Sequence, residues 1–241
     1  ATGHYARVQK SDDGFQLLRG LDQSKDQSYF LYMLGQPELA RINFPVGTLL
    51  KHQVRSAART AGLRNYDKKG STGICFIGER PFRAFLSQYI APSPGPVRTP
   101  NGRIVGEHQG LHLYTLGQRQ GLGIGGTKNG DGQPWYVVDK MVEEQTLIVA
   151  QGRHHPLLYS KILEAIEPTW IAGVPPQAVF RACAQSRYRQ TPQACTVTVT
   201  STGFQTEFDE PQWAVTPGQS VVLYDADVCL GGGLIAARWT P

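Results

Sequence analysis

Cys75 is the residue whose type and surroundings most clearly indicate chemistry. It lies in a short apolar run, ICFI at residues 74–77, with a glycine on each side and a helix-type spacing of apolar residues after it. A sulfur between a strand and a helix start lies near backbone N–H groups and the positive end of a helix dipole, which favour the thiolate. The thiolate attacks electrophiles and carries sulfur. The spacing is equally compatible with a buried cysteine that packs as a small hydrophobic residue.

A second pattern concerns positive charge. Residues 1–90 contain 13 Lys and Arg against 7 Asp and Glu, whereas residues 91–241 contain 11 against 12. In the basic part, Lys51, Arg55 and Arg59 follow one another at four-residue spacing, so on a helix they would form one stripe. Such a stripe is either an ordinary solvated helix face or a surface on which a polyanion such as RNA lies.

Two further motifs have compositions that suit ligand binding. Arg187, Tyr188 and Arg189 combine charge with an aromatic ring, which suits a phosphate backbone or an unstacked base, although a solvated turn has the same composition. The glycine-rich run at residues 121–126 superficially resembles a nucleotide loop. Because no strand precedes it and no helix pattern follows it, we interpret it as a flexible hairpin.

Composition excludes several classes of protein. The four cysteines form no CxxC pair and the six histidines are scattered, so the sequence indicates no structural metal site and suits a reducing cytoplasm. Cys183, Cys195 and Cys229 are expected to pack in cores. No apolar run approaches the roughly 20 residues that cross a bilayer, and no signal-peptide pattern opens the chain. Because the first residue is alanine within a run that reads as continuing structure, we expect a piece of a longer protein.

The elements that must position these residues change in type along the chain. The first 90 residues predict an α/β arrangement, the proline-rich stretch at 91–96 predicts a linker, and the remainder predicts β structure that ends in a small barrel. The expected elements are a hairpin of residues 2–8 and 15–18, a helix over 27–34 capped by Asp26, a helix over 51–61, a strand and helix around Cys75 that continue to Tyr89, and strands at 97–99, 104–106, 135–139, 146–150, 179–186, 195–200, 204–208, 220–224 and 233–238.

Longer runs carry more specific information than these patterns. They are ATGHYAR at 1–7, LDQSKDQSYFL at 21–31, STGICFIGER at 71–80, GEHQG at 106–110, YTLGQR at 114–119, RYRQ at 187–190 and TPGQS at 216–220. In this order, along essentially all 241 residues, the chain resembles the bacterial tRNA-specific 2-thiouridylases, which belong to the PP-loop ATP-pyrophosphatases.

The resemblance implies a fold and a function. It implies the α/β part of a PP-loop (adenine nucleotide alpha hydrolase-like) domain at residues 1–86, a small central β-rich domain at 87–161 and a C-terminal antiparallel β-barrel that binds tRNA at 162–241. The implied reaction is ATP-dependent transfer of sulfur from a cysteine persulfide to C2 of wobble uridine 34, through an adenylated uridine. The implied substrates are the tRNAs for glutamate, glutamine and lysine. The implied cofactors are ATP with magnesium and a persulfide sulfur donor. The implied protein partner is a cysteine desulfurase or a sulfur-relay protein, and no association with a membrane is expected.

The resemblance also implies roles for single residues. Cys75 matches the persulfide-bearing cysteine and Gly3 a residue that contacts ATP. The implied tRNA-binding residues are His4, Lys25, Asp26, Gln27, Arg187, Tyr188 and Gln219.

The departures from the family pattern also have consequences. The family's SGGVDSS phosphate loop and the second catalytic cysteine, which forms a disulfide with the first, are absent from these residues. We therefore expect the chain alone to be inactive. Two other functions stay open at this point: an RNA-binding module without catalysis, and a related ATP-pyrophosphatase that acts on another substrate.

Overall fold

The computed structural model describes residues 1–68, 85–86, 88–124 and 132–239. Cys75 therefore lies outside the described residues. The chain divides into two compact units, which are treated separately below. The barrel unit consists of Ala1–Lys68 with Lys161–Trp239, and the central unit is the described part of Lys69–Ser160. Among the described residues, no helix has both the length and the apolar character needed to cross a membrane.

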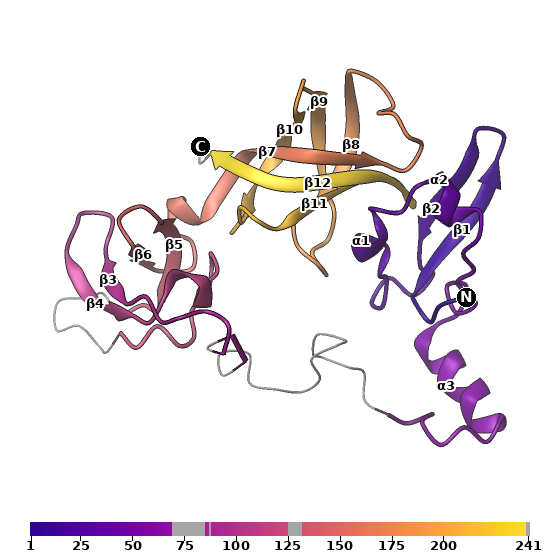
Figure 1. Cartoon of the computed structure of the whole chain (residues 1–241), viewed down its shortest axis with the longest axis horizontal. Coiled ribbons are helices and arrows are strands. Elements are labelled where there is room, and N and C mark those ends of the chain that lie inside the picture. Colours follow the sequence, from indigo (N-terminus) through magenta and orange to yellow (C-terminus); the bar gives the residue numbers. More distant parts are fainter. Residues whose placement is uncertain (69–84, 87, 125–131, 240–241) are drawn as a thin grey trace. The chain divides into compact units, whose positions relative to one another are not determined.

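Six antiparallel strands close into a barrel in the C-terminal part of the chain, drawn from orange to yellow in Figure 1. The strands follow one another around the barrel in the order β7, β12, β11, β8, β9 and β10. Their bounds are β7 Tyr159–Trp170, β8 Val179–Gln185, β9 Gln193–Val199, β10 Gly203–Trp213, β11 Ser220–Asp225 and β12 Val228–Trp239. Since a closed barrel leaves no free edge, it forms a rigid base for the elements beside it.

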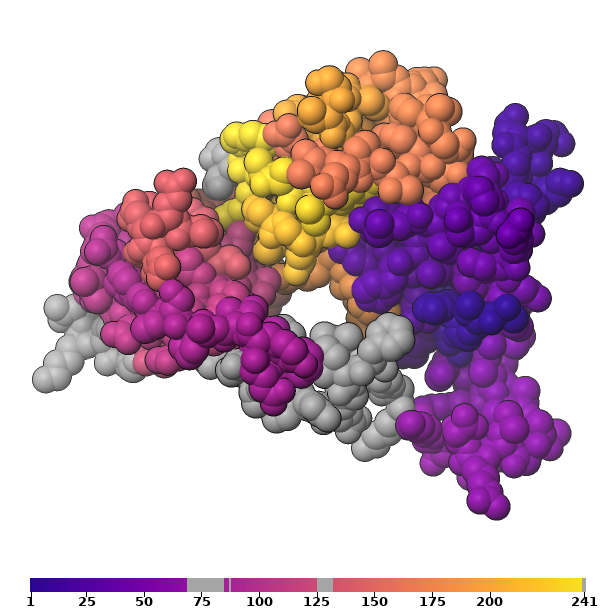
Figure 2. Space-filling view, in the orientation of Figure 1, coloured from indigo at the N-terminus to yellow at the C-terminus, as the bar shows by residue number. Residues whose placement is uncertain are grey.

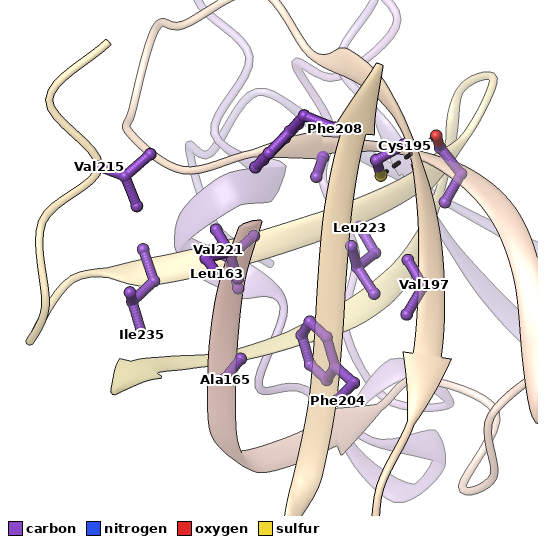
Figure 3. Packing of buried hydrophobic residues seen from close by; sticks show 12 residues of the cluster. Leu163, Ala165, Cys195, Val197, Phe204, Phe208, Val215, Val221, Leu223 and Ile235 are labelled. Atoms are coloured by element: carbon purple, nitrogen blue, oxygen red, sulfur yellow. Dashed lines mark hydrogen bonds between the residues drawn. The ribbon is translucent and has the colours of Figure 1, made fainter. Parts of the chain in front are cut away.

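Alternate side chains of these strands fill the barrel, as Figure 3 shows. On β9, Cys195 and Val197 are fully buried, whereas Thr196 and Thr198 are not, as period-two alternation requires. On β10, Phe204 is fully buried in the same core, which places a large ring against the facing strands. The prediction that Cys195 packs in a core is thus confirmed.

The closure of the barrel depends on a glycine. Gly231 of β12 pairs with Trp170 of β7 and adopts φ of 137°, a conformation that residues with side chains rarely adopt. A Cβ atom at this position would overlap the carbonyl oxygen of Thr169. Glycine therefore permits the close approach of β7 and β12.

The N-terminal residues extend the barrel sheet. Strands β1 (Ala6–Ser11) and β2 (Gly14–Arg19) form a hairpin, and β2 pairs with β12 through Leu17 and Leu18. Three helices follow, α1 (Ser28–Leu31), α2 (Gln36–Leu39) and α3 (Lys51–Thr60). One apolar core joins the hairpin, α1 and α2 to the barrel, and it consists of Ala6, Leu17, Tyr29, Tyr32, Leu39 and Phe44 with Ile171, Val222, Tyr224 and Cys229.

The central unit contains a four-stranded sheet in the order β4, β3, β6, β5. The strands are β3 (Gly95–Arg98), β4 (Ile104–His108), β5 (Trp135–Met141) and β6 (Thr146–Gln151). Two short 3₁₀ helices, η1 (Leu111–Leu113) and η2 (Pro156–Leu158), lie in the same part of the sequence. Before β3 in the sequence, the ring centroids of Phe85 and Tyr89 lie 5.1 Å apart, as expected for residues spaced by one helical turn.

Within the described residues the structure confirms the hairpin, the helix at Lys51 and the predicted strands, whereas the strand expected at Cys75 lies outside those residues. The structure differs from the predictions in four places, the first of which is α2, a short helix that was not predicted. The predicted linker reaches only to Pro94, because Pro96 lies in β3. Pro96 is paired with Glu107 of β4, but the pairing of β3 with β6 begins after it, at Val97, so the missing N–H of proline costs no hydrogen bond to β6. The helix expected over 27–34 is only α1. Strand β7 was not predicted, since Glu164, Glu167 and Pro168 hide its alternation.

Candidate nucleic-acid interface

The loop of residues 20–28, which contains three of the predicted tRNA-binding residues, is held by the carboxylate of Asp26. Its Oδ1 accepts hydrogen bonds from the backbone N–H groups of Gly20 and Ser28, at 3.0 and 3.1 Å. Its Oδ2 accepts from the hydroxyl of Ser28 at 2.9 Å and lies 3.6 Å from Nε of Arg19. The Arg19 and Asp26 side chains are only 15% and 10% exposed. This carboxylate therefore fixes the loop from inside.

The same network reaches the barrel. The guanidinium of Arg19 lies 4.3 Å from the ring centroid of Tyr224 on β11, a cation–π geometry. The Tyr224 hydroxyl is 3.1 Å from the Ser28 hydroxyl. Burial raises the pKa of Tyr224, so its hydroxyl keeps its proton for hydrogen bonding. The loop and β11 are thereby joined by buried polar side chains.

Gln27 ties this loop to the N-terminal residues. Its side-chain oxygen accepts a hydrogen bond from the Tyr5 N–H at 3.1 Å, and its backbone N–H donates to the Tyr5 carbonyl at 2.9 Å. His4, one residue earlier, is half-buried, and its Nδ1 lies 3.0 Å from the Thr2 hydroxyl. Gly3 is exposed, with no atom within 4 Å of the place where a Cβ would lie. A ligand could thus approach the backbone closely at Gly3.

Helix α1 is fastened to β11 by two tyrosine hydroxyls. The Tyr29 hydroxyl donates to the carbonyl of Ser220 at 2.8 Å, and the Tyr32 hydroxyl is 3.1 Å from the Ser220 hydroxyl. Burial raises the pKa of Tyr29 to about 12. The preceding residue, Gln219, is half-buried, and its backbone bonds to Thr216 and Ile235. The predicted barrel residue Gln219 therefore lies next to the attachment point of α1.

The turn after β8 contacts the same helix. The ring centroid of Tyr188 lies 4.3 Å from that of Phe30 and 6.0 Å from that of Tyr29. The guanidinium of Arg189 lies 5.3 Å from the Tyr188 ring centroid. Burial lowers the pKa of Arg187, which also interacts with Tyr29. The predicted residues Arg187 and Tyr188 thus form part of a surface shared with α1.

The basic stripe lies on α3 as predicted. No residue of α3 is buried, and Figure 2 shows this segment, in purple, standing out from the rest of the barrel unit. Lys51 lies 5.4 Å from the ring centroid of Tyr5, and Arg59 lies 4.9 Å from that of Tyr66. The helix begins where the Lys51 N–H donates to Asp22 Oδ2 at 2.9 Å, which lowers the pKa of that carboxyl. It ends before Gly62, whose φ of 71° is usual for the residue after a helix.

A pocket of about 390 Å³ lies beside the hairpin. It is lined by Arg7, Val8, Lys10, Phe15, Leu39, Ala40, Ile42, Asn43, Phe44, Pro45 and Thr48. Gly3, the predicted ATP contact, does not line it. Among the residues that the structure describes, no group of three or more His, Cys, Asp or Glu side chains is placed to hold a metal ion.

The barrel unit therefore brings together predicted residues that lie far apart in sequence. Gly3 and His4 directly precede Tyr5, which is hydrogen-bonded to Gln27. Helix α1, which follows Gln27, contacts Tyr188 through Phe30. Sequence reasoning gave no role to Phe30, Arg19, Ser28 and Tyr224. For Phe30 a signal was present, because Tyr29 and Tyr32 are three residues apart and share one helix face, which leaves Phe30 on another face.

The three cysteines in the described part of the chain are free thiols. Cys195 and Cys229 are buried, and burial raises the pKa of each to about 12. Such thiols stay protonated at neutral pH and are poor nucleophiles.

Comparison with known proteins gives matches along the chain. Residues 1–79 match the family model described as tRNA methyl transferase HUP domain, residues 83–151 the tRNA methyl transferase PRC-barrel domain, and residues 160–235 the Aminomethyltransferase beta-barrel domain.

Several curated proteins are similar over nearly the whole chain, and each is named tRNA-specific 2-thiouridylase MnmA. The protein of Cupriavidus taiwanensis is 55% identical over 237 residues, which are 98% of this chain and 66% of the relative. That of Burkholderia thailandensis is 53% identical over 247 residues, 100% of this chain and 64% of the relative. That of Nitrosococcus oceani is 55% identical over 236 residues, which are 98% of this chain and 64% of the relative. The chain thus spans somewhat less than two thirds of the length of these relatives.

Proposed function

Because the chain belongs to the tRNA-specific 2-thiouridylase family, we propose that it forms part of a tRNA-uridine 2-sulfurtransferase that works in the cytoplasm. The reaction replaces the C2 oxygen of wobble uridine 34 with sulfur in the tRNAs for glutamate, glutamine and lysine. The observation that carries this proposal is the identity of 53–55% to curated relatives of that name over 98–100% of the chain.

In this proposal Cys75 carries the sulfur as a persulfide. The uridine C2 carbonyl is a poor electrophile, and ATP as co-substrate supplies an AMP leaving group on its oxygen. The terminal persulfide sulfur attacks C2, the bond between C2 and oxygen breaks, and the base becomes linked to Cys75 through a disulfide. A second thiol attacks the Cys75 sulfur, so the transferred sulfur stays on C2 and the two cysteines end as a disulfide. A cellular dithiol then reduces that disulfide.

The residues present fit the nucleotide only in part. Gly3 leaves its backbone open to a ligand, but the phosphate-binding SGGVDSS run does not occur in these 241 residues. The described residues also offer no cluster of acidic side chains for magnesium. We therefore assign nucleotide activation to no residue of this chain, and we propose that the chain alone does not thiolate tRNA.

The described residues supply the means to hold RNA. Arginine and lysine side chains neutralise phosphates, and aromatic rings stack on bases that have left their helix. The α3 stripe offers Lys51, Arg55 and Arg59, all outside the apolar core. The barrel unit adds the Arg187–Tyr188 surface, which is packed against α1. Binding at several such points offsets the free energy of a few kcal/mol needed to extrude the target base.

Persulfide labelling tests the role of Cys75. The chain is incubated with a cysteine desulfurase, cysteine and, where needed, a sulfur-relay protein, and the modified cysteine is identified by peptide mass spectrometry. We expect a persulfide on Cys75 and none on Cys183, Cys195 or Cys229. The protonated thiols of Cys195 and Cys229 are buried, and Cys183 is half-buried. Cys75→Ser is the matched control. A chain that stays unlabelled, or that is labelled equally on Cys195, contradicts the proposal.

Two further measurements separate the competing functions. An RNA-binding module without catalysis would bind tRNA but leave Cys75 without sulfur. A related ATP-pyrophosphatase would place sulfur on another molecule, so nucleoside analysis of tRNA from cells that carry Cys75→Ser must show loss of 2-thiouridine at position 34 if the proposal holds. Two of the matching domain descriptions contain the words methyl transferase. The same nucleoside analysis would therefore also detect the loss of a methylated nucleoside.

A further inference from the structure

We propose that Phe30 and Tyr188 form a stacking site for one unpaired base of the bound RNA, and that Arg189 holds the adjoining phosphate. This inference rests on the proposed function, because it assumes that the chain binds RNA. It adds Phe30 to the binding residues and gives Tyr188 a specific role, as the second ring of a two-ring platform.

Phe30 is exposed although Tyr29, beside it on α1, and Tyr32, directly after the helix, are buried. Its side chain is 55% exposed, whereas Tyr29 and Tyr32 are each 8% exposed. The two tyrosines face the barrel and bond to Ser220 on β11. On a helix this arrangement turns the intervening Phe30 away from the core. The ring is therefore presented outward by a helix whose orientation is fixed.

Tyr188 supports the Phe30 ring from the neighbouring turn. The two ring centroids are 4.3 Å apart with 46° between the planes. The Tyr29 ring meets Phe30 edge-on, at 5.5 Å and 85°. Phe30 is thus held by rings from two segments that are more than 150 residues apart in the sequence. A ring that is both exposed and immobilised loses little conformational freedom when a base stacks on it.

Charge at the platform favours a nucleotide over an apolar partner. The Arg189 guanidinium lies 5.3 Å from the Tyr188 ring centroid and its side chain is exposed. Arg187 lies in the same turn. The carboxylates of the preceding loop are directed to hydrogen-bond donors instead, since Asp22 accepts from Lys51 N–H and Ser24, and Asp26 accepts from Gly20 and Ser28. Exposed aromatic faces beside arginine are the usual composition of single-stranded RNA sites.

The experiment measures binding of the 241-residue chain to an anticodon-arm RNA that carries 2-aminopurine at successive loop positions. One position should show fluorescence quenching on binding, because that base stacks on the platform. Phe30→Leu keeps an apolar side chain but removes the ring, and we expect it to weaken affinity roughly 5- to 140-fold and to abolish the quenching. Phe30→Tyr keeps the ring and should restore both.

Two controls make the result specific. Met33→Ala changes a residue that is 68% exposed in the same segment but carries no ring, and it should leave affinity and quenching unchanged. Arg189→Gln should lower the slope of log affinity against log salt by about one, because one phosphate contact is lost. Thermal unfolding of each variant verifies that the barrel unit remains folded.

Three outcomes overturn the inference. Equal affinity of Phe30→Leu and the unchanged chain would show that the ring takes no part. An equal loss of affinity for a fully paired duplex would also refute stacking, because its bases have no free face. Failure of the unchanged chain to bind the anticodon arm would overturn the proposed function as well, whereas the first two results leave that function standing.

Discussion

Replacement of Asp26 with asparagine tests whether the loop of residues 20–28 is held by one buried carboxylate. Asparagine keeps one oxygen, which can still accept from the N–H groups of Gly20 and Ser28. It places an NH₂ group where Oδ2 accepts from the Ser28 hydroxyl and faces Arg19 at 3.6 Å. The substitution therefore leaves a cation without its partner in a site where the two side chains are only 15% and 10% exposed.

The magnitude follows from these contacts. A hydrogen bond to a charged group contributes about 1.5–3 kcal/mol, and removal of one partner of a buried ion pair costs about 3–5 kcal/mol. Because the Arg19–Asp26 separation is longer than an ideal hydrogen bond, we expect the lower part of that range. The Asp26→Asn change should lower the free energy of unfolding of the barrel unit by about 2–4 kcal/mol.

Urea unfolding followed by tryptophan fluorescence gives this quantity, and hydrogen exchange at the Gly20 and Ser28 amides reports the loop locally. The matched control is Asp209→Asn. Asp209 pairs with Arg181 at shorter distances, 2.6 and 2.7 Å, but the side chains are 49% and 58% exposed. Solvent screens an exposed pair, so this change should matter less. If Asp209→Asn destabilises the protein as much as Asp26→Asn, the reasoning from burial is wrong.

Three further predictions concern the barrel unit. Tyr29 has a pKa of about 12 in the folded state and about 10 when unfolded. The protonated phenol therefore contributes about 2–3 kcal/mol to the free energy of unfolding below pH 10, and this contribution is lost as the pH rises to about 12. Tyr29→Phe should reduce the fall in the urea midpoint between pH 10 and pH 12. Gly231→Ala, which would overlap the Thr169 carbonyl, should lower the melting temperature or prevent recovery of folded protein. Cys195 and Cys229, with pKa values raised to about 12 by burial, should resist alkylation at pH 8 until urea unfolds the chain, as the count of modified thiols will show.

The regular elements were predictable where one period dominates the sequence. The alternation around Cys195 and Val197 indicated a half-buried strand, and both side chains are fully buried on β9. The four-residue spacing of Lys51 and Arg55 indicated a helix face, and α3 has that face. Such patterns depend on local geometry alone, so they need no knowledge of the rest of the fold.

Elements that bend could not be predicted in the same way. Strand β7 contains Glu167 at φ of 51°, and its register with β12 shifts between Gly232 and Leu234. A bulge of this kind interrupts the alternation of buried and exposed side chains, so the strand reads as two unrelated short segments. Helix α1 ends after Leu31 although the apolar pattern continues. Tyr29 in the helix and Tyr32 after it both bond to Ser220 of β11, a long-range contact that local spacing does not indicate.

The candidate site was only partly predictable for a related reason. Resemblance to a family identified single residues such as Lys25 and Tyr188, and the resemblance is shown at the level of the family. It could not show that α1 and the turn after β8 are in contact. That contact depends on pairing of Leu17 on β2 with Cys229 on β12, which brings the N-terminal residues to the barrel. Long-range pairing of this kind leaves no trace in local spacing.

The hydrogen bonds that Asp26 makes within the protein determine how substitutions in the loop of residues 20–28 should be interpreted. Asp26 lies between Lys25 and Gln27, yet its two oxygens already accept hydrogen bonds from Gly20 and Ser28. A carboxylate in that state has little capacity left for RNA donors and would repel a phosphate. Lys25, whose half-buried side chain ends in a cation, suits a phosphate better. A loss of RNA binding on substitution of Asp26 would therefore report the shape of the loop, and a loss on substitution of Lys25 would report contact with the RNA itself.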